Sequence, residues 1–149
     1  MQPDLKLTIN RSMIVLQYRQ PFLDWIRSVE PEFGATTTLD SLNEDGDAFL
    51  IPHEPAIDGK EDAVAWMEKR WKGFFEYKLA GWYTDESLWP KKRTLKMFRE
   101  WFAIEYRSMV WDLDTTPLEY EDCGQTRRTN HGNDGFCRSI AGTQSGIWL

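Results

Sequence analysis

Cysteine is scarce in this chain. Only two of its 149 residues are cysteines, Cys123 and Cys137, and both lie near one end of the sequence. Two cysteines are too few for a disulfide scaffold, and they favour a protein of the reducing cytoplasm. His131 lies between them, but zinc sites usually bring two ligands close together in sequence and need four in all. We therefore predict no zinc site and no cofactor.

Long apolar runs and the common catalytic motifs are also absent. No apolar run approaches the roughly 20 residues that span a bilayer, and residues 1–18 lack the charged start and apolar centre of a secretory signal. The sequence has no G-x-G-x-x-G, G-x-x-x-x-G-K-[ST], H-E-x-x-H or G-x-S-x-G motif. We therefore expect no membrane association, and common nucleotide and protease chemistries lack support.

Basic residues are fewer than acidic ones, and the imbalance is uneven. The net charge is −6. Residues 1–122 hold 15 Lys and Arg against 23 Asp and Glu, which makes −8, whereas residues 123–149 hold three Arg and one Asp, which makes +2. An acidic domain repels phosphate backbones, so we expect no nucleic-acid partner. Docking of this acidic chain on a basic protein surface is one alternative function.

Aromatic residues are plentiful at 14%, and each buried ring removes roughly 150–250 Å² from water. Apolar patterning predicts strands at 12–18, 47–52 and 104–113, the first of them buried on both faces. Helices are expected from Pro21 to the breakers Pro31 and Gly34, over 60–79 up to Gly81, and over 94–102 after a Thr94 cap. A short helical turn is expected in Asp85–Trp89, capped by Thr84.

These elements predict an α+β fold, with one small domain, a three- to four-stranded sheet and helices mainly on one face. A fourth strand at 35–41 competes with a single helical turn in Leu39–Asn43. The order of elements is compatible with a ferredoxin-like arrangement. The expected organisation is a loose N-terminal arm at 1–10, the domain at 11–120, and a disordered or non-native tail at 121–149.

The segment Gly81–Pro90, GWYTDESLWP, is followed by a predicted helix and by a predicted strand containing Ser108-Met109. This pattern resembles a family of small uncharacterised bacterial proteins over about residues 11–120. The family carries a histidine in front of Ser-Met, where this chain has Arg107. The resemblance implies no known activity and supplies no catalytic residues.

The 81–93 loop is the predicted binding surface. Trp82, Tyr83 and Trp89 combine a large apolar body with a polar handle, as interface residues often do. The same rings would also suit packing of the loop onto the sheet. Charged residues complete the predicted binding set: Asp85, Glu86, Arg93 and Arg107. We therefore predict a non-catalytic cytoplasmic binding or regulatory protein, with a protein or small-molecule partner.

A metal-dependent enzyme is the other alternative. It would use a group of nearby carboxylates as metal ligands or as acid and base: Asp85, Glu86, Glu100, Glu105 and Asp112. However, acidic residues in the first turn of a helix are favoured by its dipole. Glu105 with Arg107 also fits an ordinary ion pair on one face of a strand.

Two serines occupy equivalent positions in two short segments of similar sequence. Residues 11–15 (RSMIV) resemble residues 107–111 (RSMVW), which suggests that two strands occupy similar places in the sheet. Ser12 and Ser108 are candidate nucleophiles only if a base lies nearby. The two histidines, His53 and His131, lie in no nucleophile motif, so the sequence assigns neither of them to a serine.

Overall fold

The computed structural model describes residues 8–53 and 57–120, so the predicted tail at 121–149 and most of the predicted arm lie outside the described residues. The chain divides into two compact units. Among the described residues, one unit contains 8–53, 57–75 and 90–114, and the other contains 76–89 and 115–120. The predicted domain limits of 11–120 stay a prediction.

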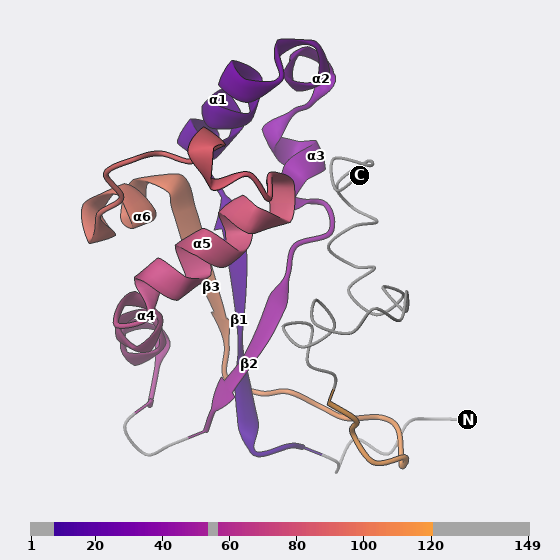
Figure 1. The fold of residues 1–149 in the computed structure, drawn as a ribbon. Helices are drawn as coiled ribbons and strands as arrows, with labels where there is room; N and C mark the ends of the chain where they lie inside the picture. Colours follow the sequence, from indigo (N-terminus) through magenta and orange to yellow (C-terminus); the bar gives the residue numbers. More distant parts are fainter. Residues whose placement is uncertain (1–7, 54–56, 121–149) are drawn as a thin grey trace, which may run out of the picture. The chain divides into compact units, whose positions relative to one another are not determined.

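The larger unit contains an antiparallel sheet in the order β2-β1-β3 (Figure 1). Its strands are β1 Arg11–Tyr18, β2 Ala48–Pro52 and β3 Phe102–Arg107. Ser12 lies opposite Ile51 of β2, and Ile14 lies opposite Tyr106 of β3. The α+β class is confirmed. The ferredoxin-like arrangement is not confirmed, since its six-element order needs four strands and the described residues form three.

Of the two alternatives for 35–41, the fourth strand is wrong and the helical turn in Leu39–Asn43 is confirmed. This region holds two short helices, α2 Pro31–Thr36 and α3 Leu39–Asn43. Thr38 begins α3 with a capping box, because its hydroxyl accepts from the Ser41 amide while the Ser41 hydroxyl accepts from the Thr38 amide. Local capping therefore outweighs the strand preference of the three threonines.

Strand β1 alternates strictly in burial, which corrects the prediction that both faces are buried. Ser12, Ile14, Leu16 and Tyr18 are buried, while the intervening side chains are half-buried. Rings of three helices pack near Tyr18 and its β3 neighbour Phe102. These helices are α1 Gln20–Val29, α5 Trp71–Trp82 and α6 Leu95–Trp101. The helices thus gather mainly on one face, as predicted.

Helix α1 begins as predicted, with Pro21 in its first turn, where no amide donor is needed. Pro31 is predicted to end the helix that starts near Pro21, but it is the first residue of the next helix, α2. Gly34 lies inside α2 and is buried against Arg27 of α1. It therefore allows two helices to approach closely, and it is not a helix breaker.

The predicted single helix over 60–79 is two helices, α4 Lys60–Glu68 and α5. The break follows from a tightened turn, in which the Arg70 amide donates to the Met67 carbonyl at 2.9 Å. The Arg70 guanidinium donates to the Trp66 carbonyl at 2.9 Å and lies 3.8 Å above the Trp66 ring. Gly81 does not break α5, which runs on to Trp82.

Helix α6 and strand β3 follow each other without a loop. Thr94 caps α6 as predicted, since its hydroxyl accepts from the Met97 amide at 3.1 Å. Strand β3 then starts at Phe102 and ends at Arg107, so the predicted limits of 104–113 are wrong at both ends. Arg99 of α6 forms a two-point ion pair with Glu68 at the end of α4. Hydrogen bonding to Glu68 raises the pKa of Arg99 above its usual value.

Asn43 completes the hydrogen bonding of β1 beyond the end of β2. Its side-chain oxygen accepts from the Tyr18 amide at 2.8 Å, and its side-chain nitrogen donates to the Tyr18 carbonyl at 3.0 Å. Strand β2 pairs with β1 only as far as Val15. The Asn43 amide group therefore takes the place of a strand neighbour for the last residue of β1.

Replacing Asn43 by alanine is expected to lower the free energy of unfolding by about 1–2 kcal/mol, because both backbone groups of Tyr18 lose their partner. Urea denaturation followed by circular dichroism measures the change. The adjacent exposed residue provides the control, and Glu44→Ala should change stability by less than about 0.5 kcal/mol. Equal stabilities of the two variants would contradict this role for Asn43.

Candidate functional site

The smaller unit holds most of the predicted 81–93 binding loop. Trp82, Tyr83 and Trp89 are buried, with exposed fractions of 3%, 7% and 8%. The Trp89 indole nitrogen donates to the Tyr83 carbonyl at 2.7 Å. These three rings therefore pack in the folded protein, which matches the packing alternative for them. Residues 84–88 between them are exposed.

Asp85 and Glu86 belong to this exposed stretch. Asp85 begins the 3-10 helix η1 Glu86–Leu88, and its carboxylate accepts from the Ser87 amide at 2.9 Å. The predicted helical turn is confirmed, but its cap is Asp85 and not Thr84. Both carboxylates lie near a helix start, where negative charge is favoured without any ligand.

Arg93 and Arg107 lie in the larger unit, and each binds close sequence neighbours. The Arg93 guanidinium donates to the Pro90 carbonyl at 2.8 Å. The Arg107 guanidinium donates to Glu105 at 3.1 Å, so the plain ion pair expected for these two residues is present. Among residues 8–53 and 57–120, no group of three or more His, Cys, Asp or Glu side chains is arranged to hold a metal ion.

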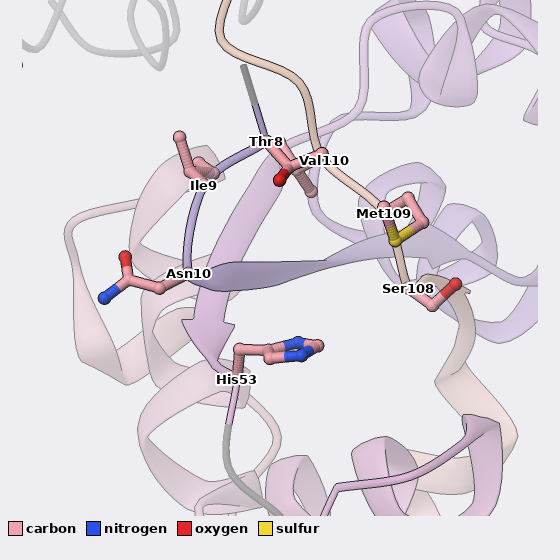
Figure 2. A pocket seen from close by; sticks show the side chains of 7 residues that line it. All are labelled: Thr8, Ile9, Asn10, His53, Ser108, Met109 and Val110. Atoms are coloured by element: carbon pink, nitrogen blue, oxygen red, sulfur yellow. The ribbon is translucent and has the colours of Figure 1, made fainter. Parts of the chain in front are cut away.

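The larger unit contains a pocket of about 300 Å³ at the end of the sheet where β1 begins. Figure 2 shows the side chains that line it: Thr8, Ile9, Asn10, His53, Ser108, Met109 and Val110. The segments that precede β1 and follow β3 are joined here. The Ile9 amide donates to the Val110 carbonyl at 3.2 Å, and Thr8 forms a single bridge with Trp111.

Among the described residues, the pocket wall is mixed in chemistry and includes no Asp, Glu, Lys or Arg. The lining residues include the apolar Ile9, Met109 and Val110 and the polar Thr8, Asn10 and Ser108, and the side-chain amide of Asn10 points away from the other lining residues (Figure 2). His53 is the one titratable side chain among the described residues of this wall. Pockets that are largely apolar with a few polar groups are typical of small-molecule sites.

The imidazole ring of His53 lies at the pocket (Figure 2), and one of its nitrogens is within hydrogen-bond distance of a buried hydroxyl. Its Nδ1 lies 3.3 Å from Ser12 Oγ, and Ser12 Oγ lies 3.4 Å from the hydroxyl of Tyr106. Ser12 is 0% exposed. The three side chains come from β1, from β3 and from the residue that follows β2, so the sheet itself sets their arrangement.

The sequence hypothesis missed this group. It considered Ser12 and Ser108 only on condition that a base lay nearby, and the structure brings His53 to Ser12 across 41 residues. The similarity of residues 11–15 and 107–111 was the one sequence feature that pointed to this place, because both segments lie at the same end of the sheet. They do so for a different reason from the predicted one, since residue 11 opens β1 whereas residue 107 ends β3.

No family model, curated protein or solved structure matches the chain. The resemblance to small bacterial proteins therefore stays a prediction. In the part of the chain that the structure describes, no helix is both long enough and apolar enough to cross a membrane.

Proposed function

We propose that this protein is a non-catalytic binding protein whose ligand is a small molecule held in the His53 pocket. One observation carries the proposal: the imidazole lies in a pocket of about 300 Å³ and its inner nitrogen is within hydrogen-bond distance of the buried Ser12 hydroxyl. Because the hydrogen bond with Ser12 fixes the orientation of the ring, the other ring nitrogen can bind a ligand with little further loss of conformational entropy.

The same geometry supports binding over serine catalysis. A serine nucleophile has to reach the substrate carbonyl, and the Ser12 side chain is 0% exposed. Within residues 8–53 and 57–120, its hydrogen-bond neighbours are an imidazole and a phenol, and no hydrogen bond joins His53 to a carboxylate as in a serine triad. Ser12 thus acts on His53 and has no route to a ligand in the pocket.

The class of protein is the one that the sequence predicts, but the proposed site is different. The rings of the 81–93 loop are buried, so a partner at that loop would meet the exposed residues 84–88 and the exposed Lys91 and Lys92. Binding of a protein there, and docking of the acidic chain on a basic surface, stay predictions. The pocket is favoured because it combines a concave shape with an oriented polar group.

A titration followed by two-dimensional ¹⁵N–¹H NMR tests the proposal on the full chain. A panel of small organic acids, amides and amines is added, and the expected shifts concentrate at the amides of 8–10, 53 and 108–110. Ser108→Trp should fill the pocket and remove these shifts, because the indole occupies the space of the ligand. Leu118→Trp, at an exposed residue outside the pocket wall, should leave them intact.

Two results would contradict the proposal. One is the absence of shifts at the pocket amides with every compound of the panel. The other is shifts that are the same in the wild type and in Ser108→Trp.

A further inference from the structure

The buried hydroxyl of Ser12 has to be satisfied within the protein. Its side chain is 0% exposed, and a buried hydroxyl without a hydrogen bond is costly. Among the described residues, the side-chain groups within hydrogen-bond distance are His53 Nδ1 at 3.3 Å and the Tyr106 hydroxyl at 3.4 Å. A serine hydroxyl has one hydrogen to donate. If Ser12 donates to one neighbour, it accepts from the other.

Tyr106, Ser12 and His53 form a relay of two hydrogen bonds, and the chemistry of the three groups indicates which atom donates in each bond. A phenol hydroxyl is a stronger hydrogen-bond donor than an aliphatic hydroxyl, and a neutral imidazole nitrogen is a strong acceptor. The two distances by themselves allow either direction. This order of donor and acceptor strength favours donation from Tyr106 to Ser12 and from Ser12 to Nδ1 of His53. An imidazole that accepts at Nδ1 carries its hydrogen on Nε2. The nitrogen available to a ligand is then a donor.

We infer that the His53 pocket takes a small organic ligand with a carboxylate or carbonyl oxygen, which accepts a hydrogen bond from Nε2–H of His53. The inference rests on the proposed function and names its ligand class. The remaining wall suits the rest of such a molecule, since Ile9, Met109 and Val110 offer apolar contact to a short chain. An ammonium ligand is disfavoured, because none of these lining residues is acidic and the donor on Nε2 faces it.

Ser12 and Tyr106 are positioning residues in this arrangement. The separations of 3.3 Å and 3.4 Å are at the long end of hydrogen bonding between side chains. An acceptor on Nε2 polarises the ring and makes Nδ1 a better acceptor, so ligand binding should strengthen both bonds of the relay. The affinity for an acceptor ligand and the tautomer of His53 are therefore linked.

Three probes of the same length test the ligand class by NMR titration of the full chain: hexanoate, hexanamide and hexylammonium. Hexanoate and hexanamide should bind at the pocket amides, and hexylammonium should bind at least about tenfold more weakly. His53→Phe keeps a flat ring without the donor, and it should weaken hexanoate binding about tenfold or more. Long-range ¹⁵N–¹H spectra of the histidine rings should show His53 with its hydrogen on Nε2.

The positioning role has its own readout. Tyr106→Phe and Ser12→Ala should shift the tautomer ratio of His53 toward Nδ1–H and weaken hexanoate binding in parallel. Tyr120→Phe removes a phenol hydroxyl at an 86% exposed residue and should change neither. Circular dichroism checks that each variant is folded. A purely structural role of Ser12 and Tyr106 would leave the tautomer ratio unchanged.

The outcomes separate this inference from the proposed function. Preferred binding of hexylammonium in the pocket, or a His53 hydrogen on Nδ1, would overturn the inferred ligand class and leave a binding pocket in place. Failure of hexanoate and hexanamide to shift the pocket amides would overturn the ligand class, and failure of these probes together with every compound of the panel would overturn both. Binding of hexanoate that is equally strong in His53→Phe would overturn the role of Nε2–H alone.

Discussion

Replacing Phe22 by alanine is expected to lower the free energy of unfolding by about 3–5 kcal/mol. Phe22 is 0% exposed and lies at the centre of the aromatic core of the larger unit. Its ring centroid lies 4.4 Å from Tyr18, 5.1 Å from Trp25 and 5.5 Å from Phe102. Removal of the ring loses these contacts and leaves a cavity between α1 and the sheet, which the rigid neighbours cannot fill.

Urea denaturation monitored by circular dichroism measures this loss. Phe22→Leu keeps most of the apolar volume and should cost only about 1–1.5 kcal/mol. Leu50→Ala provides the surface control, because Leu50 is 47% exposed, and it should cost far less than Phe22→Ala. A cost below about 1 kcal/mol for Phe22→Ala would show that this ring is not at the centre of the core.

Gly34→Ala is expected to destabilise the protein by about 2–3 kcal/mol, although alanine is the better helix former. A Cβ atom at Gly34 would lie 2.5 Å from Cγ and 2.7 Å from Cα of Arg27. The side chain of Arg27 can move, but its Cα belongs to helix α1. The two helices would have to separate, which would also disturb the bond from Arg27 Nε to the Gly34 carbonyl at 3.0 Å.

Gly73→Ala is the matched control for this substitution. Gly73 also lies in a helix, α5, but it is exposed and a Cβ atom there meets nothing within 4 Å. The same change should therefore stabilise the protein by about 0.5–1 kcal/mol, as expected for a helix interior. Opposite signs in urea denaturation would support the close approach of α1 and α2. Stabilisation by both variants would contradict it.

Much of the secondary structure follows from local patterns in the sequence. The branched run before Tyr18 predicts β1, and the phase of Phe22, Trp25 and Ile26 predicts the buried side of α1. Thr94 and Pro21 mark helix starts because capping and the geometry of proline act within one helical turn. These signals are local, so they are readable without knowledge of the fold.

Other features depend on contacts that local patterns do not contain. The break at Lys69–Arg70 divides an apolar stripe that is continuous in sequence, and the burial of Trp82 and Trp89 removes them from the predicted binding surface. Periodicity identifies which side of a helix is apolar. It does not tell whether a partner or the protein's own interior covers that side.

The sequence by itself determined the α+β class, the central strand and the starts of α1, α4 and α6, because these depend on residues within a few positions of one another. The tertiary structure alone decided the candidate site. Ser12 meets His53 across 41 residues and Tyr106 across 94. The antiparallel register sets Ser12 opposite Ile51 and Met13 opposite Arg107, so the ends of β2 and β3 come to the start of β1. Strand pairing of this kind rests on long-range hydrogen bonds and shared burial, which no short motif encodes.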